Sequence, residues 1–70
     1  MDEFEIGDKI VHLESLLDGN FIIWVVTKKD EKGMTCAMSG AAKWTYMPAD
    51  IISNYISLDE AIDIYPEYFL

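Results

Sequence analysis

The sequence of 70 residues predicts a single, mainly β domain that ends in a helix. Three observations support this fold class. Short runs rich in β-branched and aromatic residues alternate with Gly- and Asp-containing turns, one run is apolar on both faces, and the C-terminal residues have helical spacing. We expect a four- to five-stranded antiparallel sheet, either a small barrel or a strongly bent meander, with the helix lying across it.

The first two strands are expected at residues 9–13 and 21–27. Gly7 and Asp8 form a turn before the first run, and an Asp-Gly-Asn turn at residues 18–20 precedes the second. The second run, Phe-Ile-Ile-Trp-Val-Val-Thr, places apolar side chains on both faces. Because such a strand needs cover on both sides, we place it in the middle of the sheet and Trp24 in the core.

Two further strands are expected at residues 34–38 and 43–47. A polar, Gly-terminated connection at residues 29–33 makes the first of them the return strand of a hairpin. The second alternates and stops at Pro48, which cannot donate a hydrogen bond to a sheet. Residues 49–56 fit either a helical turn or a last strand.

The C-terminal helix begins with a capping box formed by Ser57 and Glu60 and ends at Pro66. Its apolar positions recur at helical spacing: Leu58, Ala61, Ile62 and Tyr65. The chain therefore divides into an N-terminal arm (residues 1–6), a β-barrel-like core (residues 7–56) and a C-terminal helix with an aromatic tail (residues 57–70).

The charges are strongly acidic and unevenly distributed. The formal net charge is −8. Residues 28–43 carry four lysines against two acids, whereas the rest of the chain carries eleven acids against one lysine. Nucleic acids and anionic membranes are met by Lys and Arg, so we expect neither as a direct partner. A protein with a basic or aromatic-accepting surface is the expected partner.

The sequence offers no set of residues typical of an enzyme, a metal site or a cofactor site. Cys36 and His12 are the single residues of their types, and their spacing does not indicate a catalytic pair. We expect Cys36 to be a small buried side chain, and we expect no metal, cofactor or nucleotide, because there is no ligand spacing or Gly-rich loop. The acidic start, the short apolar runs and the unpaired cysteine favour a cytoplasmic location.

Residues 6–56 resemble the small SH3-like and Tudor-like barrels of short bacterial and phage proteins. The segments that carry the resemblance are Gly7-Asp8-Lys9-Ile10-Val11, Trp24-Val25-Val26, the Lys/Asp/Gly hairpin, Met34-Thr35-Cys36 and the turn from Pro48 to Asp50. The resemblance implies a small barrel. The peptide-binding pattern of SH3 domains is matched only in part, by Glu14, Asp18, Trp44, Tyr46 and Tyr55, so no ligand class follows from it.

Aromatic and acidic side chains are the candidates for an interaction surface. Trp44 and Tyr46 are either exposed or packed beneath the C-terminal helix. The aromatic tail docks on its own sheet, on a second copy of the chain as a homodimer, or on another protein. The acids of the helix are a solvated face or part of the contact. The full candidate set is Trp44, Tyr46, Tyr55, Tyr65, Tyr68, Phe69, Asp59, Glu60 and Asp63.

These observations predict a non-enzymatic, acidic protein-interaction module, such as an inhibitor or adaptor encoded by a phage or mobile element and acting on a larger host protein. Three alternatives remain open. The acids mimic a nucleic acid and block a basic DNA- or RNA-binding site of a host enzyme; the basic hairpin binds nucleic acid directly; or the chain is a homo-oligomeric structural subunit.

Overall fold

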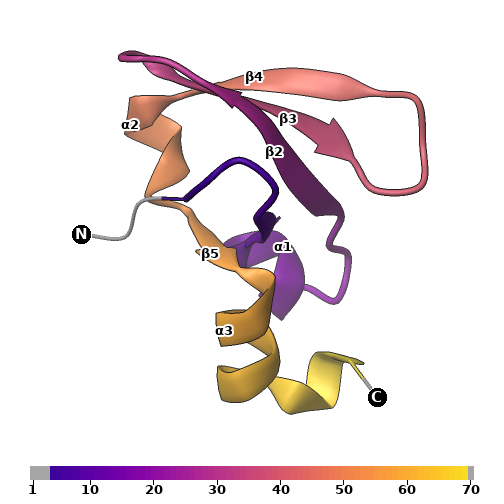
Figure 1. The fold of residues 1–70 in the computed structure, drawn as a ribbon. Coiled ribbons are helices and arrows are strands. Elements are labelled where there is room, and N and C mark those ends of the chain that lie inside the picture. Colours follow the sequence, from indigo (N-terminus) through magenta and orange to yellow (C-terminus); the bar gives the residue numbers. More distant parts are fainter. Residues whose placement is uncertain (1–3, 70) are drawn as a thin grey trace.

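A computed structural model describes residues 4–69 and contains one five-stranded antiparallel sheet (Figure 1). The strands are β1 (Lys9–His12), β2 (Ile23–Lys29), β3 (Gly33–Met38), β4 (Trp44–Pro48) and β5 (Tyr55–Ser57). Their spatial order is β4-β3-β2-β1-β5. The first four form the expected meander, and β2 is the central strand as predicted. The sheet is open, with β4 and β5 at its two edges, so the closed barrel is not confirmed.

Within the described residues, four short helical segments connect or follow the strands: α1 (Leu13–Leu17), α2 (Ala49–Ile52), α3 (Leu58–Ile64) and the 3-10 helix η1 (Pro66–Phe69). The capping residue of α3 is confirmed, because Ser57 Oγ accepts a hydrogen bond from Glu60 N–H at 3.1 Å. Both interpretations of residues 49–56 apply in part: α2 is a helical turn, and β5 follows it as the last strand.

Helix α1 was not expected from the sequence. The strand predicted over residues 9–13 ends one residue earlier, and Leu13 begins the helix. The cap is His12, whose Nδ1 accepts a hydrogen bond from Ser15 N–H at 3.3 Å. Histidine is not among the residues that usually cap helices, so the sequence gives no start signal here.

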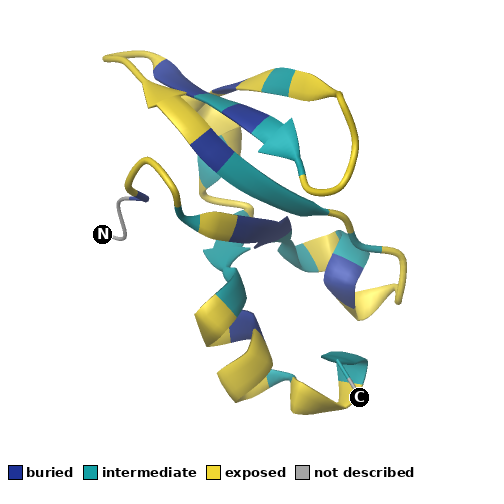
Figure 2. Ribbon diagram, turned by 45° about the vertical axis from the view of Figure 1, so that its right-hand side comes forward, coloured by how far each residue is buried: buried dark blue, intermediate teal, exposed yellow. Residues whose placement is uncertain are grey.

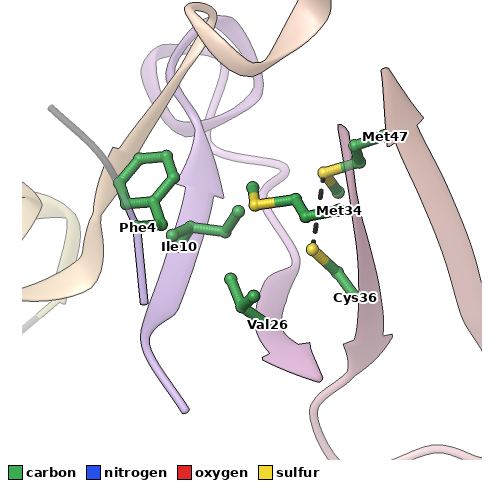
Figure 3. Packing of buried hydrophobic residues seen from close by; sticks show 6 residues of the cluster. All are labelled: Phe4, Ile10, Val26, Met34, Cys36 and Met47. Carbon is green, nitrogen blue, oxygen red and sulfur yellow. Dashed lines mark hydrogen bonds between the residues drawn. The ribbon is translucent and has the colours of Figure 1, made fainter. Parts of the chain in front are cut away.

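Alternating side chains of β1 and β2 build two cores on opposite faces of the sheet. On β1, Ile10 enters the first core and Val11 the second; on β2, Val26 enters the first and Ile23 packs on the second. Figure 3 shows the buried members of the first core: Phe4, Ile10, Val26, Met34, Cys36 and Met47. The prediction that the doubly apolar strand needs cover on both faces is therefore confirmed only in part. The strand expected over residues 21–27 is β2 at residues 23–29, Val26 is its one buried residue, and Val25 is half-buried outside both cores.

The second core lies between β1, β5 and the helices. Its buried members, Val11, Leu16 and Ala61, come from β1, α1 and α3. The aromatic tail packs against this second core, where the ring centroids of Phe21 and Phe69 are 5.1 Å apart. Of the three expected sites for the tail, the structure has it docked on its own chain. Figure 2 shows the buried residues mainly on the strands, with further ones on α1 and α3.

Candidate interaction surfaces

Strand β4 exposes two aromatic side chains on the half of a sheet face that the helices leave uncovered. Its side chains alternate, so Met47 is buried in the first core while Trp44 and Tyr46 point to the other face. Trp44 is 73% exposed and Tyr46 39%. Helix α3 packs on β1 and β5, at the far end of the strand order. Of the two interpretations of this pair, exposure is the one observed.

A hydrogen-bonded turn fixes Tyr46 in this position. The Asp30 carboxylate accepts hydrogen bonds at Oδ1 from Tyr46 Oη at 2.9 Å, from Lys32 N–H at 2.8 Å and from Gly33 N–H at 2.9 Å. These bonds, led by that from Lys32, hold the pKa of Asp30 below its usual value. Desolvation and the neighbouring Asp30 raise the pKa of Tyr46. Asp30 thereby links the β2–β3 turn to β4. In the sequence, the one indication of this link was an Asp at a turn-forming position.

The backbone of β4 faces outward at the same two residues. Met38 N–H donates to Lys43 C=O at 2.7 Å, and Ala49 N–H donates to Lys32 C=O at 2.8 Å. Antiparallel strands alternate between residues that bond a neighbour and residues that point away from it. Because positions 43 and 49 bond toward β3, the N–H and C=O groups of Trp44 and Tyr46 point away from the sheet.

A second surface is the acidic end formed by the helices. Helices α1, α3 and η1 with their capping residues carry six acids and no Lys or Arg: Glu14, Asp18, Asp59, Glu60, Asp63 and Glu67. In Figure 1, α3 and η1 lie at the bottom of the molecule and α1 lies above them near the middle, whereas the β2–β3 hairpin, which carries three lysines, lies at the top. Within residues 4–69 the single ion pair joins Lys29 and Glu5, 3.8 Å apart and outside the acidic end.

The outward side of α3 is the most concentrated part of the acidic end. At about 100° per residue, Asp59, Glu60 and Asp63 fall in one sector opposite the buried Ala61. All three acids are exposed. Ile62 and Ile64 flank this sector and are 44% and 53% exposed. An acidic sector with one exposed isoleucine on each side is therefore available to a partner.

The other candidate aromatic residues pack within the chain. The ring of Tyr55 meets His12 edge-on with centroids 5.0 Å apart, and burial raises its pKa. Tyr65, Tyr68 and Phe69 pack against the second core, where Tyr68 Oη also donates to Leu17 C=O at 3.5 Å. These four side chains stabilise the fold.

Cys36 and His12 serve separate structural roles. Cys36 is fully buried in the first core, and its Sγ donates to Met47 Sδ at 3.7 Å (Figure 3). Burial raises the pKa of this thiol, which keeps it protonated. His12 Nδ1 is engaged by Ser15 at the start of α1.

Over residues 4–69, no group of three or more His, Cys, Asp or Glu side chains is arranged to hold a metal ion. The helices in the same range are too short and too polar to cross a membrane.

Comparison with known proteins finds no family model that matches the chain and no significant match among curated proteins or solved structures. The resemblance to SH3-like and Tudor-like barrels therefore stays a prediction, and the function has to be argued from the surfaces themselves.

Proposed function

We propose that this chain is a non-enzymatic interaction module that binds a larger, basic protein through its acidic helical end. The observation that carries the proposal is the segregation of charge: six acids and no base on the helices, without ion-pair partners among residues 4–69. Unpaired, exposed carboxylates steer a basic partner toward this end and give binding that weakens with salt.

Exposed isoleucines add contact area to the acidic end. Ile62 and Ile64 lie on opposite sides of the three acids of α3, so each adds apolar contact at one border of the acidic sector. Each exposed ion pair contributes about 0.2–1 kcal/mol, so several pairs and an apolar contact are needed together for stable binding. In this proposal the chain acts in the cytoplasm as an inhibitor or adaptor, encoded by a phage or mobile element, of a larger host protein.

The proposal includes the absence of catalysis. This part is supported by the positions of the two residues best suited to nucleophilic chemistry. Cys36 is buried without access to solvent, and His12 caps a helix. A thiol nucleophile needs exposure and a lowered pKa, and burial raises that of Cys36.

Mimicry of a nucleic acid is the second candidate, and the same segregation favours it. Lysines 28, 29 and 32 would interrupt an acidic strip, but they belong to the hairpin and not to the helical end. In this version the partner's own nucleic acid competes with the chain for one basic site. Displacement of the bound chain by DNA or RNA separates mimicry from binding elsewhere on the partner.

Paired charge-neutral variants test the proposal. Glu60→Gln with Asp63→Asn removes two charges from the acidic end, and Glu31→Gln with Asp50→Asn removes two exposed charges elsewhere. Both variants have a net charge of −6, from the −8 of the parent chain. The immobilised proteins are exposed to a lysate of the native host, and the bound proteins are quantified by mass spectrometry.

We expect the first variant to bind the captured partner about 2- to 30-fold more weakly, and the second to bind it nearly as the parent does. Raising the salt concentration should release the partner from the parent chain. Equal losses for both variants, or binding that resists high salt, would show that the acidic end is not the contact surface.

A further inference from the structure

We propose that the outer edge of β4 is a self-association site, at which β4 pairs antiparallel with β4 of a second copy of this chain. The resulting dimer has twofold symmetry and one continuous sheet across both copies. The site is separate from the acidic helical end, because α3 lies against β1 and β5 at the opposite side of the sheet.

The hydrogen-bonding pattern of β4 matches itself. The outward N–H and C=O groups belong to Trp44 and Tyr46, as the bonds of the flanking positions to β3 require. With the twofold axis at Thr45, Trp44 of each copy lies opposite Tyr46 of the other. Each such pair exchanges two N–H···O=C bonds, which gives four bonds in the dimer.

The same register brings the exposed aromatic side chains together. Trp44 and Tyr46 share one face of β4, so each Trp44 becomes the cross-strand neighbour of a Tyr46. Two aromatic pairs then cover the sheet face on which Trp44 is 73% exposed in the single chain. Aromatic cross-strand pairs contribute roughly 0.2–1 kcal/mol each, in addition to the area they bury.

Charge selects a second copy of this chain as the occupant. Residues 44–48 carry no charge in a chain of net charge −8, so two copies repel least at this edge. Lys43 precedes β4 and Asp50 lies in α2, directly after it. In the register centred on Thr45, Asp50 of one copy aligns about 10 Å beyond Lys43 of the other along the strands, so the uncharged stretch carries the contact.

Pro48 limits the ladder to this short stretch. The nitrogen of Pro48 lies on the outward-facing side of β4, so the missing N–H costs no hydrogen bond to β3. An added strand, however, finds no donor at this position. The shared surface is therefore small, and we expect dissociation constants between about 10 µM and about 1 mM. Salt should strengthen the dimer by screening the two acidic bodies, which is the opposite of its effect on a basic partner.

A cysteine cross-link tests the register directly. Facing residues of a non-hydrogen-bonded antiparallel pair have Cα atoms about 4.5 Å apart, within the span of a disulfide. Thr45→Cys should therefore form a dimer disulfide under mild oxidation. Lys43→Cys is the matched control, because its two copies lie about 13 Å apart along the strands. Cys36 is buried and is common to both variants.

Sedimentation of the unmodified full chain tests the association without cross-linking. Trp44→Lys should weaken the dimer at least about tenfold, whereas Ile64→Lys, an identical charge change on α3, should leave it intact.

A chain that stays monomeric up to about 1 mM, or a Lys43→Cys protein that cross-links as well as Thr45→Cys, would overturn the proposal. The capture experiment with the acidic-end variants is unaffected by these outcomes, so the proposed function and this inference succeed or fail independently.

Discussion

Replacing Gly33 by alanine tests how β3 and β4 pack at the start of their ladder. Gly33 is buried, and a Cβ built there would overlap the carbonyl oxygen of Met47. It would also lie 2.9 Å from both Pro48 Cα and Tyr46 Oη. Two of these three atoms belong to the backbone, so no side-chain rotation relieves the overlap and β4 itself has to move.

The cost follows from two opposing effects. Inserting a methyl group into a well-packed site costs about 1–3 kcal/mol. Alanine also restricts the unfolded chain, which returns about 0.4–1 kcal/mol. We therefore expect Gly33→Ala to lower the free energy of unfolding by about 1–2 kcal/mol and the melting temperature by about 5–15 °C in a domain of this size.

Circular dichroism during thermal and urea unfolding measures this change, and a double-mutant cycle with Tyr46→Phe locates its cause. Because the main overlap is with the backbone, removing the Tyr46 hydroxyl should not rescue the alanine variant, and the coupling should stay below about 0.5 kcal/mol. An unchanged melting temperature, or rescue by Tyr46→Phe, would refute the reasoning.

Three further predictions concern the turn, the thiol and the tail. The pKa of Asp30 is lowered in the folded state, so its stabilisation is complete above its unfolded pKa and is lost as pH falls through the folded value. The stability difference between the parent and Asp30→Asn should therefore shrink between about pH 5 and about pH 2 in urea titrations; a constant difference would contradict this. Cys36 should react with a thiol reagent only at the rate of unfolding, and rapid labelling of the folded chain would argue against its burial. Phe69→Ala should cost about 1–2 kcal/mol of unfolding free energy, whereas Trp44→Ala should cost less than about 0.5 kcal/mol; equal costs would show that the tail is not docked.

Local patterns were sufficient to place most strands. Turn residues such as Gly7 and Gly19, both with positive φ, bound the first segments, and side-chain alternation and Pro48 define β4. Helix α1 escaped detection because its cap is His12 and because five residues are too few for a helical periodicity. Phe4, assigned to an N-terminal arm, is buried in the first core, which a lone aromatic residue near a terminus does not reveal.

The candidate surfaces were likewise predictable from the sequence only in part. Alternation in β4 showed that Trp44 and Tyr46 share a face, and the acids of α3 were correctly expected on one side of a helix. Which face would be covered depended on where α3 and the tail docked. The outward N–H and C=O groups of β4 depended on its position at the sheet edge, which is a property of strand order.

The amino-acid sequence by itself determined the mainly β composition, the central position of the doubly apolar strand and the acidic character of the C-terminal helix, because each follows from side-chain type and short-range spacing. Only the tertiary structure decided that the sheet is open, that the tail packs on its own chain and that Trp44 faces solvent. Those outcomes depend on which segments, distant in sequence, bury one another's apolar surface. The free energy of that burial is gained only when two segments meet, so it cannot be read from either segment alone.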